Sequence, residues 1–307
     1  MISEIFLTPQ VFSDNGVDAI QRLRDLKEVL FPRNGASPIV VTNLALSKWV
    51  QETSRMMLAN GNQDVRQLAL GLFTKIEEEL LVDRSMPFAS LPKTEVEWLG
   101  QASCTNAEFP LALAVNAERL NSTKASSLNV VADCDSDLLN DCLKNPRRIE
   151  RTFTAQKPLL RTLCGHSQWM IIQFPFVRGI DDEYETLVQI FRLVDTRASW
   201  MQKCDIEIQI HPKGSNAVTT IRKQLEEGRF KKSAQIVRLA SHEFNDRTIL
   251  AGLFDTLHGK PIRIARWLIQ PSHLAVRMKQ DLRSDHETTW SFFGRKEAAE
   301  MLEKLQS

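Results

Sequence analysis

Short apolar runs alternate with amphipathic stretches along the first half of the chain. Runs of consecutive apolar residues are typical of buried strands, and apolar residues that recur every three or four positions are typical of helices. The strands are expected at 4–7, 38–41, 110–115 and 128–132. The helices are expected at 17–30, 46–60 and 65–82, the first with Asp14 as its N-cap, and Trp98 is expected in a polar connection. Such alternation favours parallel strands covered by helices.

The second half repeats this pattern more regularly. Residues 205–211 alternate apolar and polar positions, which is the period-two pattern of a strand. The other strands are expected at 169–174, 235–239, 247–252, 261–269 and 288–293, and the helices at 153–164, 181–201, 216–229 and 295–305. Asn145-Pro146 interrupts the pattern between the halves, because proline disfavours helix in the residue before it. We therefore expect an α/β protein of two domains, 1–147 and 148–307, each a mixed or mainly parallel sheet covered by helices.

Composition and charge exclude few classes of protein. Apolar residues make up 43% of the 307 residues, enough for two cores. The 39 basic and 38 acidic residues nearly cancel, so the chain lacks the overall positive charge of many nucleic-acid-binding proteins, although a local basic patch stays open. Five cysteines without a CxxC pair indicate neither a disulfide framework nor a zinc cluster. Without a signal peptide or a membrane-length apolar run, we expect a cytoplasmic protein that does not enter membranes.

The most informative polar segment lies between two expected strands, at residues 240–247. It holds His242, Asp246 and Arg247. Arginine can bind a phosphate with two parallel hydrogen bonds, histidine can transfer a proton or attack phosphorus, and a carboxylate can orient both. These three residues are the candidate catalytic group. The alternative is a turn in which Asp246 and Arg247 pair with each other.

The residues Asn245-Asp246-Arg247, followed by the apolar run Thr248-Ile249-Leu250, give the second half a resemblance to the phospholipase-D-like superfamily. In the branch that it resembles, a His-Asp-Arg triplet opens a strand after alternating strands and helices. Asn245 stands where that triplet has histidine, and His211-Pro212-Lys213 has the superfamily's His-x-Lys spacing without the aspartate that should follow. The resemblance implies a phospholipase-D-like C-terminal domain without hydrolysis by the usual route.

By analogy with that superfamily, we expect a non-catalytic subunit that binds a partner protein or nucleic acid. The setting implied is a bacterial multi-component system, with anti-phage defence as an example. The alternative is an active phosphodiesterase or nuclease. Whether the chain also associates with itself stays open.

An acidic segment follows the apolar run 128–132. Asp133, Asp135 and Asp137 alternate there, and carboxylates at the end of a strand can coordinate Mg²⁺ for phosphoryl-transfer chemistry. The alternative is an acidic turn that caps a short helix from Leu138. The expectation is therefore no cofactor, with Mg²⁺ as the alternative.

Basic residues at the end of the expected helix 216–229 are candidates for phosphate contacts. Arg229, Lys231 and Lys232 lie there, and Asn245 joins them as a candidate for phosphate or nucleic-acid binding. The alternative is a solvated helix end, where positive charge is favourable in any case. No glycine-rich phosphate loop accompanies them, so a nucleotide-binding fold of that kind is poorly supported.

Overall fold

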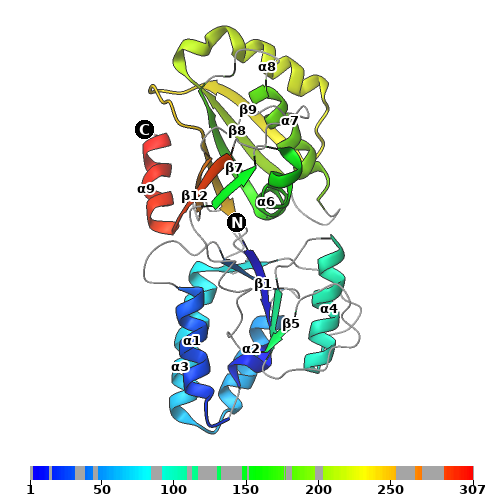
Figure 1. Cartoon of the computed structure of the whole chain (residues 1–307), viewed down its shortest axis with the longest axis vertical. Helices are drawn as coiled ribbons and strands as arrows, with labels where there is room; N and C mark the ends of the chain where they lie inside the picture. Colours follow the sequence, from blue (N-terminus) through cyan, green and yellow to red (C-terminus); the bar gives the residue numbers. More distant parts are fainter. Residues whose placement is uncertain are drawn as a thin grey trace. The chain divides into compact units, whose positions relative to one another are not determined.

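A computed structural model of the chain gives the arrangement of its helices and strands (Figure 1). The residues that it describes are 3–13, 16–31, 39–43, 48–83, 92–108, 113–116, 130–132, 147–150, 152–175, 177, 182–197, 203–253, 267–271 and 287–306. Strands and helices alternate through most of this length. The prediction of an α/β protein is confirmed.

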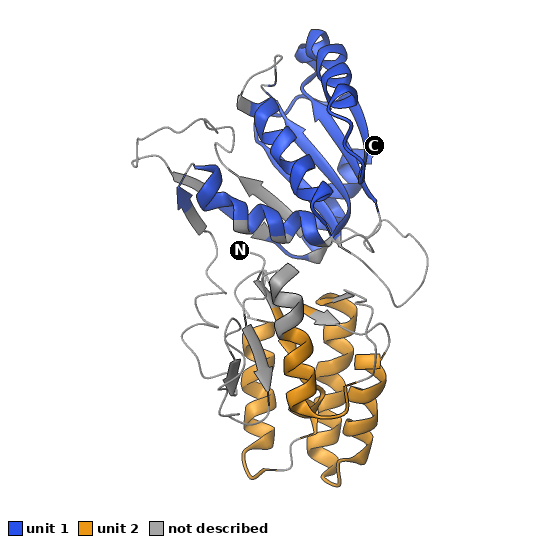
Figure 2. Ribbon diagram, turned by 90° about the vertical axis from the view of Figure 1, so that its right-hand side faces the viewer, with its two compact units in different colours: residues 1, 145–254, 262–307 blue, residues 2–144, 255–261 orange. Residues whose placement is uncertain are grey.

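The chain divides into two compact units, which Figure 2 shows in different colours. One contains residues 2–144 with 255–261, and the other contains residue 1 with 145–254 and 262–307. Each unit has its own sheet.

The N-terminal unit is built on a fully parallel five-stranded sheet in the order β3-β2-β1-β4-β5. Its strands are β1 (Ser3–Leu7), β2 (Ile39–Asn43), β3 (Leu81–Asp83), β4 (Leu113–Asn116) and β5 (Val130–Ala132). Its helices are α1 (Ala19–Leu30), α2 (Lys48–Ala59), α3 (Gln63–Glu79) and α4 (Glu95–Glu108), with a 3₁₀ turn η1 (Pro9–Phe12) after β1.

Aromatic side chains fill the core beside β1. Phe12, Trp49 and Phe73 pack against one another with ring centroids 5.6–6.3 Å apart, and all three are buried. Trp49 also donates a hydrogen bond from Nε1 to the carbonyl oxygen of Leu7, 2.7 Å away. This bond fixes α2 against the end of β1.

Three expectations for this unit are wrong. The first helix begins after Asp18, not Asp14, and the expected helix 65–82 ends at Glu79, so that Leu81–Asp83 forms β3. Trp98 lies buried on α4. A capping box starts that helix, because Thr94 and Glu97 each accept a hydrogen bond from the other's backbone N–H.

The C-terminal unit contains a mixed seven-stranded sheet in the order β6-β12-β11-β10-β7-β8-β9. Its strands are β6 (Arg147–Glu150), β7 (Ser167–Phe174), β8 (Cys204–Ile210), β9 (Ser233–Leu239), β10 (Thr248–Leu253), β11 (Trp267–Pro271) and β12 (Glu287–Phe293). Strands β7, β8 and β9 are parallel, whereas β10, β11, β12 and β6 pair antiparallel. β6 lies where the sequence predicts a break between domains.

Helices pack on both faces of this sheet. They are α6 (Phe153–His166), α7 (Asp182–Asp195), α8 (Ser215–Glu227) and α9 (Arg295–Gln306), and a 3₁₀ turn η2 (Pro212–Gly214) precedes α8. α7 ends earlier than the expected residue 201. α9 packs by Ala298, Leu302 and Leu305 on the face that carries Trp169 and Ile171. α8 packs on the opposite face, where Val237 lies.

A polar network crosses the α9 face of β7, β8 and β9. Gln173 Nε2 donates to Gln209 Oε1 at 3.0 Å, and Gln209 Nε2 donates to Glu207 Oε1 at 2.6 Å. Arg238 on β9 also meets Glu207 Oε1 at 2.6 Å, and its Nη2 lies 3.4 Å from the carbonyl oxygen of Leu305 on α9. The network thereby ties the C-terminal helix to the sheet.

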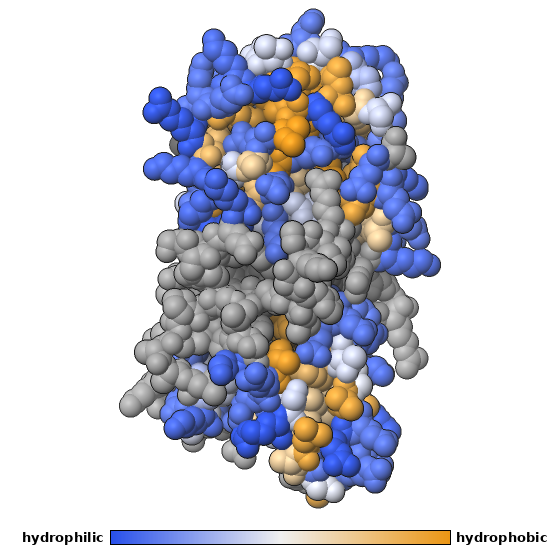
Figure 3. Space-filling model, turned by 180° about the vertical axis from the view of Figure 1, so that it is seen from behind, coloured by the Kyte–Doolittle hydropathy of each residue, from blue (hydrophilic) through white to orange (hydrophobic). Residues whose placement is uncertain are grey.

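Within the described residues, no helix is long and apolar enough to cross a membrane. On the face drawn in Figure 3, hydrophilic residues outnumber apolar ones among the coloured residues, and apolar side chains gather in places. The large apolar residues that are described as exposed are Val17, Leu58, Leu70, Val96, Ile236 and Leu239.

Candidate functional site

The carboxyl ends of the parallel strands β7, β8 and β9 meet at one edge of the C-terminal sheet. β10 is antiparallel to β7, with Thr248 paired to Gln173, so β10 begins at that same edge. Segment 240–247 joins β9 to β10 and therefore runs past the ends of β8 and β7. Polar groups from three separate parts of the chain meet here, which is where open α/β sheets commonly bind ligands.

Glu243 in this segment is held by two basic groups from the turn after β8. Its Oε1 lies 3.0 Å from Lys213 Nζ, and its Oε2 lies 4.0 Å from His211 Nε2. The hydrogen bond from Lys213, supported by its charge and that of His211, lowers the pKa of the Glu243 carboxyl. Lys213 and Glu243 are both exposed, so a ligand in solution can reach the pair.

The imidazole of His211 is oriented by its own backbone. Its Nδ1 accepts a hydrogen bond from the N–H of Lys213 at 3.2 Å, so in the neutral ring the proton is assigned to Nε2, which points toward Glu243. The lone pair that a nucleophile would need is thus engaged on the Nδ1 side. This arrangement suits His211 to binding an anion rather than to attacking phosphorus.

An aromatic ring lies near two histidines at the same edge. The ring centroid of Phe244 is 5.8 Å from that of His211 and 6.1 Å from that of His242. Phe244 is half-buried, while His242 is exposed and lies with Nδ1 3.4 Å from Ser241 Oγ. His242 is thus the exposed ring of the three, since the side chain of His211 is only 12% exposed, and nucleic-acid bases can stack on exposed rings.

Arg247 is mostly buried and is directed inward toward α7. Its Nε and Nη2 both lie 2.7 Å from Oε1 of Glu183, whose side chain is only 5% exposed. This ion pair joins the start of β10 to the first turn of α7. Because the guanidinium already holds a buried carboxylate, its position is explained by packing without a ligand.

The structure places the three candidate catalytic residues in one short segment with different surroundings. His242 and Asp246 are exposed, and Arg247 is turned to Glu183. Their sequence neighbour Asn245 is also exposed. Catalysis by this group stays a prediction.

The basic residues Arg229, Lys231 and Lys232 lie at the other end of β9, just before its first residue. Seven residues of strand separate them from the segment that holds Asn245, which amounts to about 20 Å. Asp195 accepts hydrogen bonds from the backbone N–H groups of Lys231 and Lys232, and Lys232 Nζ bonds the carbonyl oxygen of Arg197. The four predicted phosphate contacts therefore do not form a single site.

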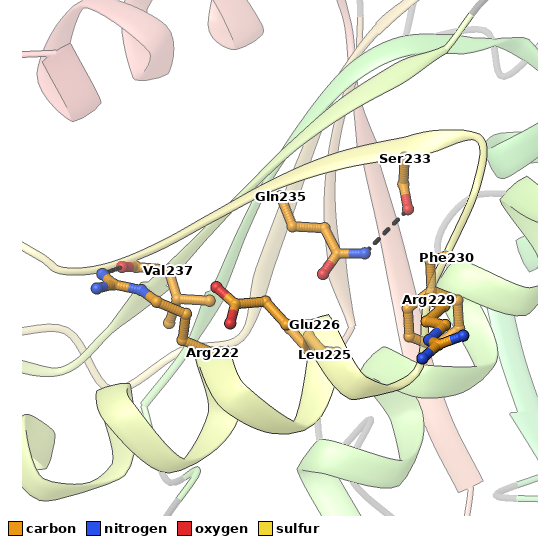
Figure 4. Close-up of a pocket in the computed structure, with 8 residues that line it drawn as sticks. All are labelled: Arg222, Leu225, Glu226, Arg229, Phe230, Ser233, Gln235 and Val237. Carbon is orange, nitrogen blue, oxygen red and sulfur yellow. Dashed lines mark hydrogen bonds between the residues drawn. The ribbon is translucent and has the colours of Figure 1, made fainter.

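Arg229 instead lines a pocket of about 220 Å³ between α8 and β9 (Figure 4). Leu225, Phe230 and Val237 are its apolar residues, and Arg222, Glu226, Arg229, Ser233 and Gln235 are its polar ones. The turn into β9 is tight, since Arg229 has a φ of 48° and a Cβ on Gly228 would lie 2.7 Å from the Phe230 ring. The Phe230 ring packs on Phe191 of α7, 5.0 Å between centroids.

The acidic residues Asp133, Asp135 and Asp137 lie outside the described residues. The strand before them is confirmed as β5, which ends at Ala132. Among the described residues, no group of three or more His, Cys, Asp or Glu side chains could hold a metal ion.

Sequence reasoning missed the residues that make most of the contacts at the sheet edge. Glu183 gives no local signal, because its partner Arg247 is 64 positions away. The His-x-Lys spacing of His211 and Lys213 is visible in the sequence, but their relation to Glu243 depends on the parallel pairing of β8 with β9.

Comparisons with known proteins add little to this geometry. No model of a known protein family matches the chain, and no curated protein matches it. A solved structure of TrmBL2, an archaeal chromatin protein described as showing a novel mode of DNA binding, is similar at 9% identity with a TM-score of 0.27. The match covers 53% of this chain and 52% of that one, so this chain spans about half the length of TrmBL2. At that score the likeness supports no conclusion about fold or function.

Proposed function

We propose that the chain is a non-catalytic binding subunit with a phospholipase-D-like C-terminal unit that holds single-stranded nucleic acid at the carboxyl edge of its sheet. The observation that supports this most is the ion pair of Lys213 with the carboxylate of Glu243, which has the imidazole of His211 4.0 Å away. A carboxylate held by a lysine and an imidazole marks a position where a negative group is stable. A phosphate oxygen has the same chemical requirement.

The aromatic and cationic groups of this edge suit a nucleic acid better than a free phosphate. Phe244, flanked by His211 and His242, offers a ring surface within the same segment as Glu243. A base stacked on an aromatic ring contributes about 1–3 kcal/mol with little sequence preference. The proposed ligand is thus a single strand whose phosphate replaces Glu243 beside Lys213.

Two features favour binding over cleavage. The guanidinium of Arg247 is held by the buried Glu183, and the Nδ1 lone pair of His211 is engaged by the backbone.

The charges at this edge indicate that nucleic acid binds with modest affinity. Lys213 and Arg247 face three carboxylates, those of Glu183, Glu243 and Asp246, so lysine and arginine give this edge no excess of positive charge. From the resemblance to the superfamily we further propose a cytoplasmic role in a bacterial multi-component system, such as one for anti-phage defence.

The test measures binding and cleavage of the same probe, a fluorescein-labelled 12-mer of oligo(dT). We expect anisotropy to rise on titration of the full chain, with Lys213→Ala weakening binding and Glu243→Gln strengthening it about two- to fivefold, as removal of one surface charge allows. The matched control is Lys223→Ala, a lysine on the exposed surface of α8. The labelled strand should stay intact with or without Mg²⁺.

Two results would contradict the proposal. One is failure of the wild-type chain to bind the probe at low salt. The other is cleavage that disappears in a His242→Ala variant, which would favour the alternative of an active phosphodiesterase. Loss of cleavage in EDTA would direct attention to Asp133, Asp135 and Asp137 instead.

A further inference from the structure

We infer that β9 is a docking edge for an extended, acidic segment of a partner polypeptide, which adds as an eighth strand beside the groove between β9 and α8. This surface is separate from the carboxyl edge of the sheet and does not depend on the function proposed for that edge. β9 is the last strand of the sheet and pairs with β8 alone among the described strands.

The hydrogen bonds of β9 show which of its backbone groups face outward. Cys204 N–H donates to the carbonyl oxygen of Lys232, and Ala240 N–H donates to that of Ile210. Because backbone groups alternate sides along a strand, the even-numbered residues face β8 and the odd-numbered residues Ser233, Gln235, Val237 and Leu239 face away. Outward backbone groups of this kind are complementary to another strand.

Several protections that natural proteins place on an exposed edge are missing along β9. The strand contains neither proline nor lysine, and Ile236 and Leu239 are 62% and 40% exposed. Arg222 on α8 does donate a hydrogen bond from Nη2 to the carbonyl oxygen of Val237, at 2.9 Å. A long flexible side chain can move aside, so this contact can be exchanged for a backbone N–H of an incoming strand.

The pocket beside this edge can receive a side chain of the incoming strand. Its volume of about 220 Å³ lies next to Ser233, Gln235 and Val237, three of the outward-facing residues (Figure 4). Leu225 and Phe230 supply apolar surface for an aliphatic side chain. Main-chain pairing would give affinity and the pocket would give selectivity.

Charge around the groove favours an acidic partner. Arg222 and Arg229 line it against the carboxylate of Glu226, and Lys231 and Lys232 follow in the turn, where Asp195 accepts hydrogen bonds from their backbone N–H groups. The same charges disfavour a second copy of this chain as the occupant. Pairing of two β9 strands about their middle would bring two Arg222 side chains together, and like charges in such a position are unfavourable.

The experiment uses the full chain and a labelled synthetic peptide, Thr-Glu-Thr-Leu-Thr-Glu-Thr-Asp-Thr, whose even positions share one face, so that leucine can enter the pocket while the acidic side chains beside it meet Arg222 and Arg229. Its two control peptides are a version with lysine at every acidic position and a version N-methylated at every residue after the first, which has no backbone N–H left to donate to a strand edge. We expect the acidic peptide to bind at least tenfold more tightly than either control. Gln235→Pro, which removes an outward N–H at an edge position where proline is tolerated, and Arg229→Glu should each weaken binding at least fivefold.

The control variant is Lys213→Ala, which lies at the other end of the strands and should leave peptide binding unchanged. Unfolding midpoints of Gln235→Pro and Arg229→Glu within 3 °C of wild type would show that both variants remain folded. Equal binding of the acidic and lysine peptides, or full binding by folded Gln235→Pro, would overturn the inference. So would a concentration-dependent dimer of the wild type that Gln235→Pro abolishes, since a second copy would then be the occupant.

Discussion

Arg247 and Glu183 form a largely buried ion pair, with two guanidinium nitrogens each 2.7 Å from one carboxylate oxygen. The pair connects the beginning of β10 to the first turn of α7. Removing one partner leaves the other charge buried, which costs about 3–5 kcal/mol, whereas replacing both can be nearly neutral. We therefore expect Glu183→Gln and Arg247→Met each to lower the denaturant midpoint strongly.

The double variant Glu183→Gln with Arg247→Met should recover part of this loss, as urea unfolding followed by circular dichroism can show. Full additivity of the two single effects would indicate that the pair does not act as a unit. If Arg247→Met instead left stability unchanged but abolished nucleic-acid binding, Arg247 would be a ligand contact rather than a structural residue.

Trp49 and Trp98 offer a matched comparison in the N-terminal unit. Both indoles are buried, but Trp49 Nε1 bonds the carbonyl oxygen of Leu7, whereas Trp98 Nε1 has no hydrogen-bond partner among the described residues. Changing either residue to phenylalanine removes a similar volume. Trp49→Phe should cost about 0.5–1.5 kcal/mol more than Trp98→Phe, because it also removes a buried hydrogen bond. Equal losses in urea unfolding would refute this role of the bond.

Glu207 is the central acceptor of the polar network on the α9 face, since Gln209 and Arg238 both donate to its Oε1. Glu207→Leu should destabilise the C-terminal unit by about 1–3 kcal/mol, because it leaves two polar groups without their acceptor. The control is Asp205→Leu on the same strand, where the side chain is exposed. A similar effect of both substitutions on the free energy of unfolding would contradict the prediction.

Two buried cysteines should make the free energy of unfolding decrease at alkaline pH. Burial raises the pKa of the Cys164 thiol to about 12 and that of Cys204 to about 11, against an ordinary value of 9.0. Above pH 9 the unfolded chain releases protons that the folded chain retains, so the free energy of unfolding should fall as pH rises from 9 toward 11. Urea unfolding at pH 8 and pH 10 measures this fall, which should be smaller in Cys164→Ala.

The same burial should make both thiols unreactive in the folded chain. At pH 8, a thiol reagent such as DTNB should label Cys164 and Cys204 only after denaturation, as mass spectrometry of the labelled peptides can show. Rapid labelling of either cysteine without denaturant would contradict the buried positions.

The strands and helices with regular apolar spacing could be predicted from the sequence, and those set by distant contacts could not. The expected strand 205–211 is confirmed as Cys204–Ile210, yet its polar residues Glu207 and Gln209 are buried. Alternation alone predicts that such residues face water. The sequence does not show that Arg238 and Gln173 from neighbouring strands meet them and satisfy their hydrogen bonds.

A local signal explains one of the errors in the N-terminal unit, whereas a distant contact explains another. The Thr94–Glu97 capping box was present in the sequence and would have predicted α4 around Trp98. β3 had no comparable signal. It follows α3 after one residue, Leu80, without glycine or proline, and its pairing with β2 decides that Leu81–Asp83 is a strand.

At the candidate site, the sequence indicated the right segment but not the relations within it. His242, Asp246 and Arg247 were chosen for their chemistry, whereas the contacts of Glu243 with Lys213 and of Arg247 with Glu183 connect residues 30 and 64 positions apart. Only the order of strands in the sheet brings such residues together.

The salt dependence of single-strand binding tests the central claim most directly. Contact with one or two phosphates predicts that log Kd rises with log salt concentration with a slope of about 0.7–1.4, and Lys213→Ala should lower that slope by about 0.7. The measurement is a series of anisotropy titrations of the oligo(dT) probe at salt concentrations from about 25 to about 200 mM. This range is wide enough to determine the slope. A slope that Lys213→Ala leaves unchanged, or binding that does not respond to salt, would contradict a phosphate contact at this edge of the sheet.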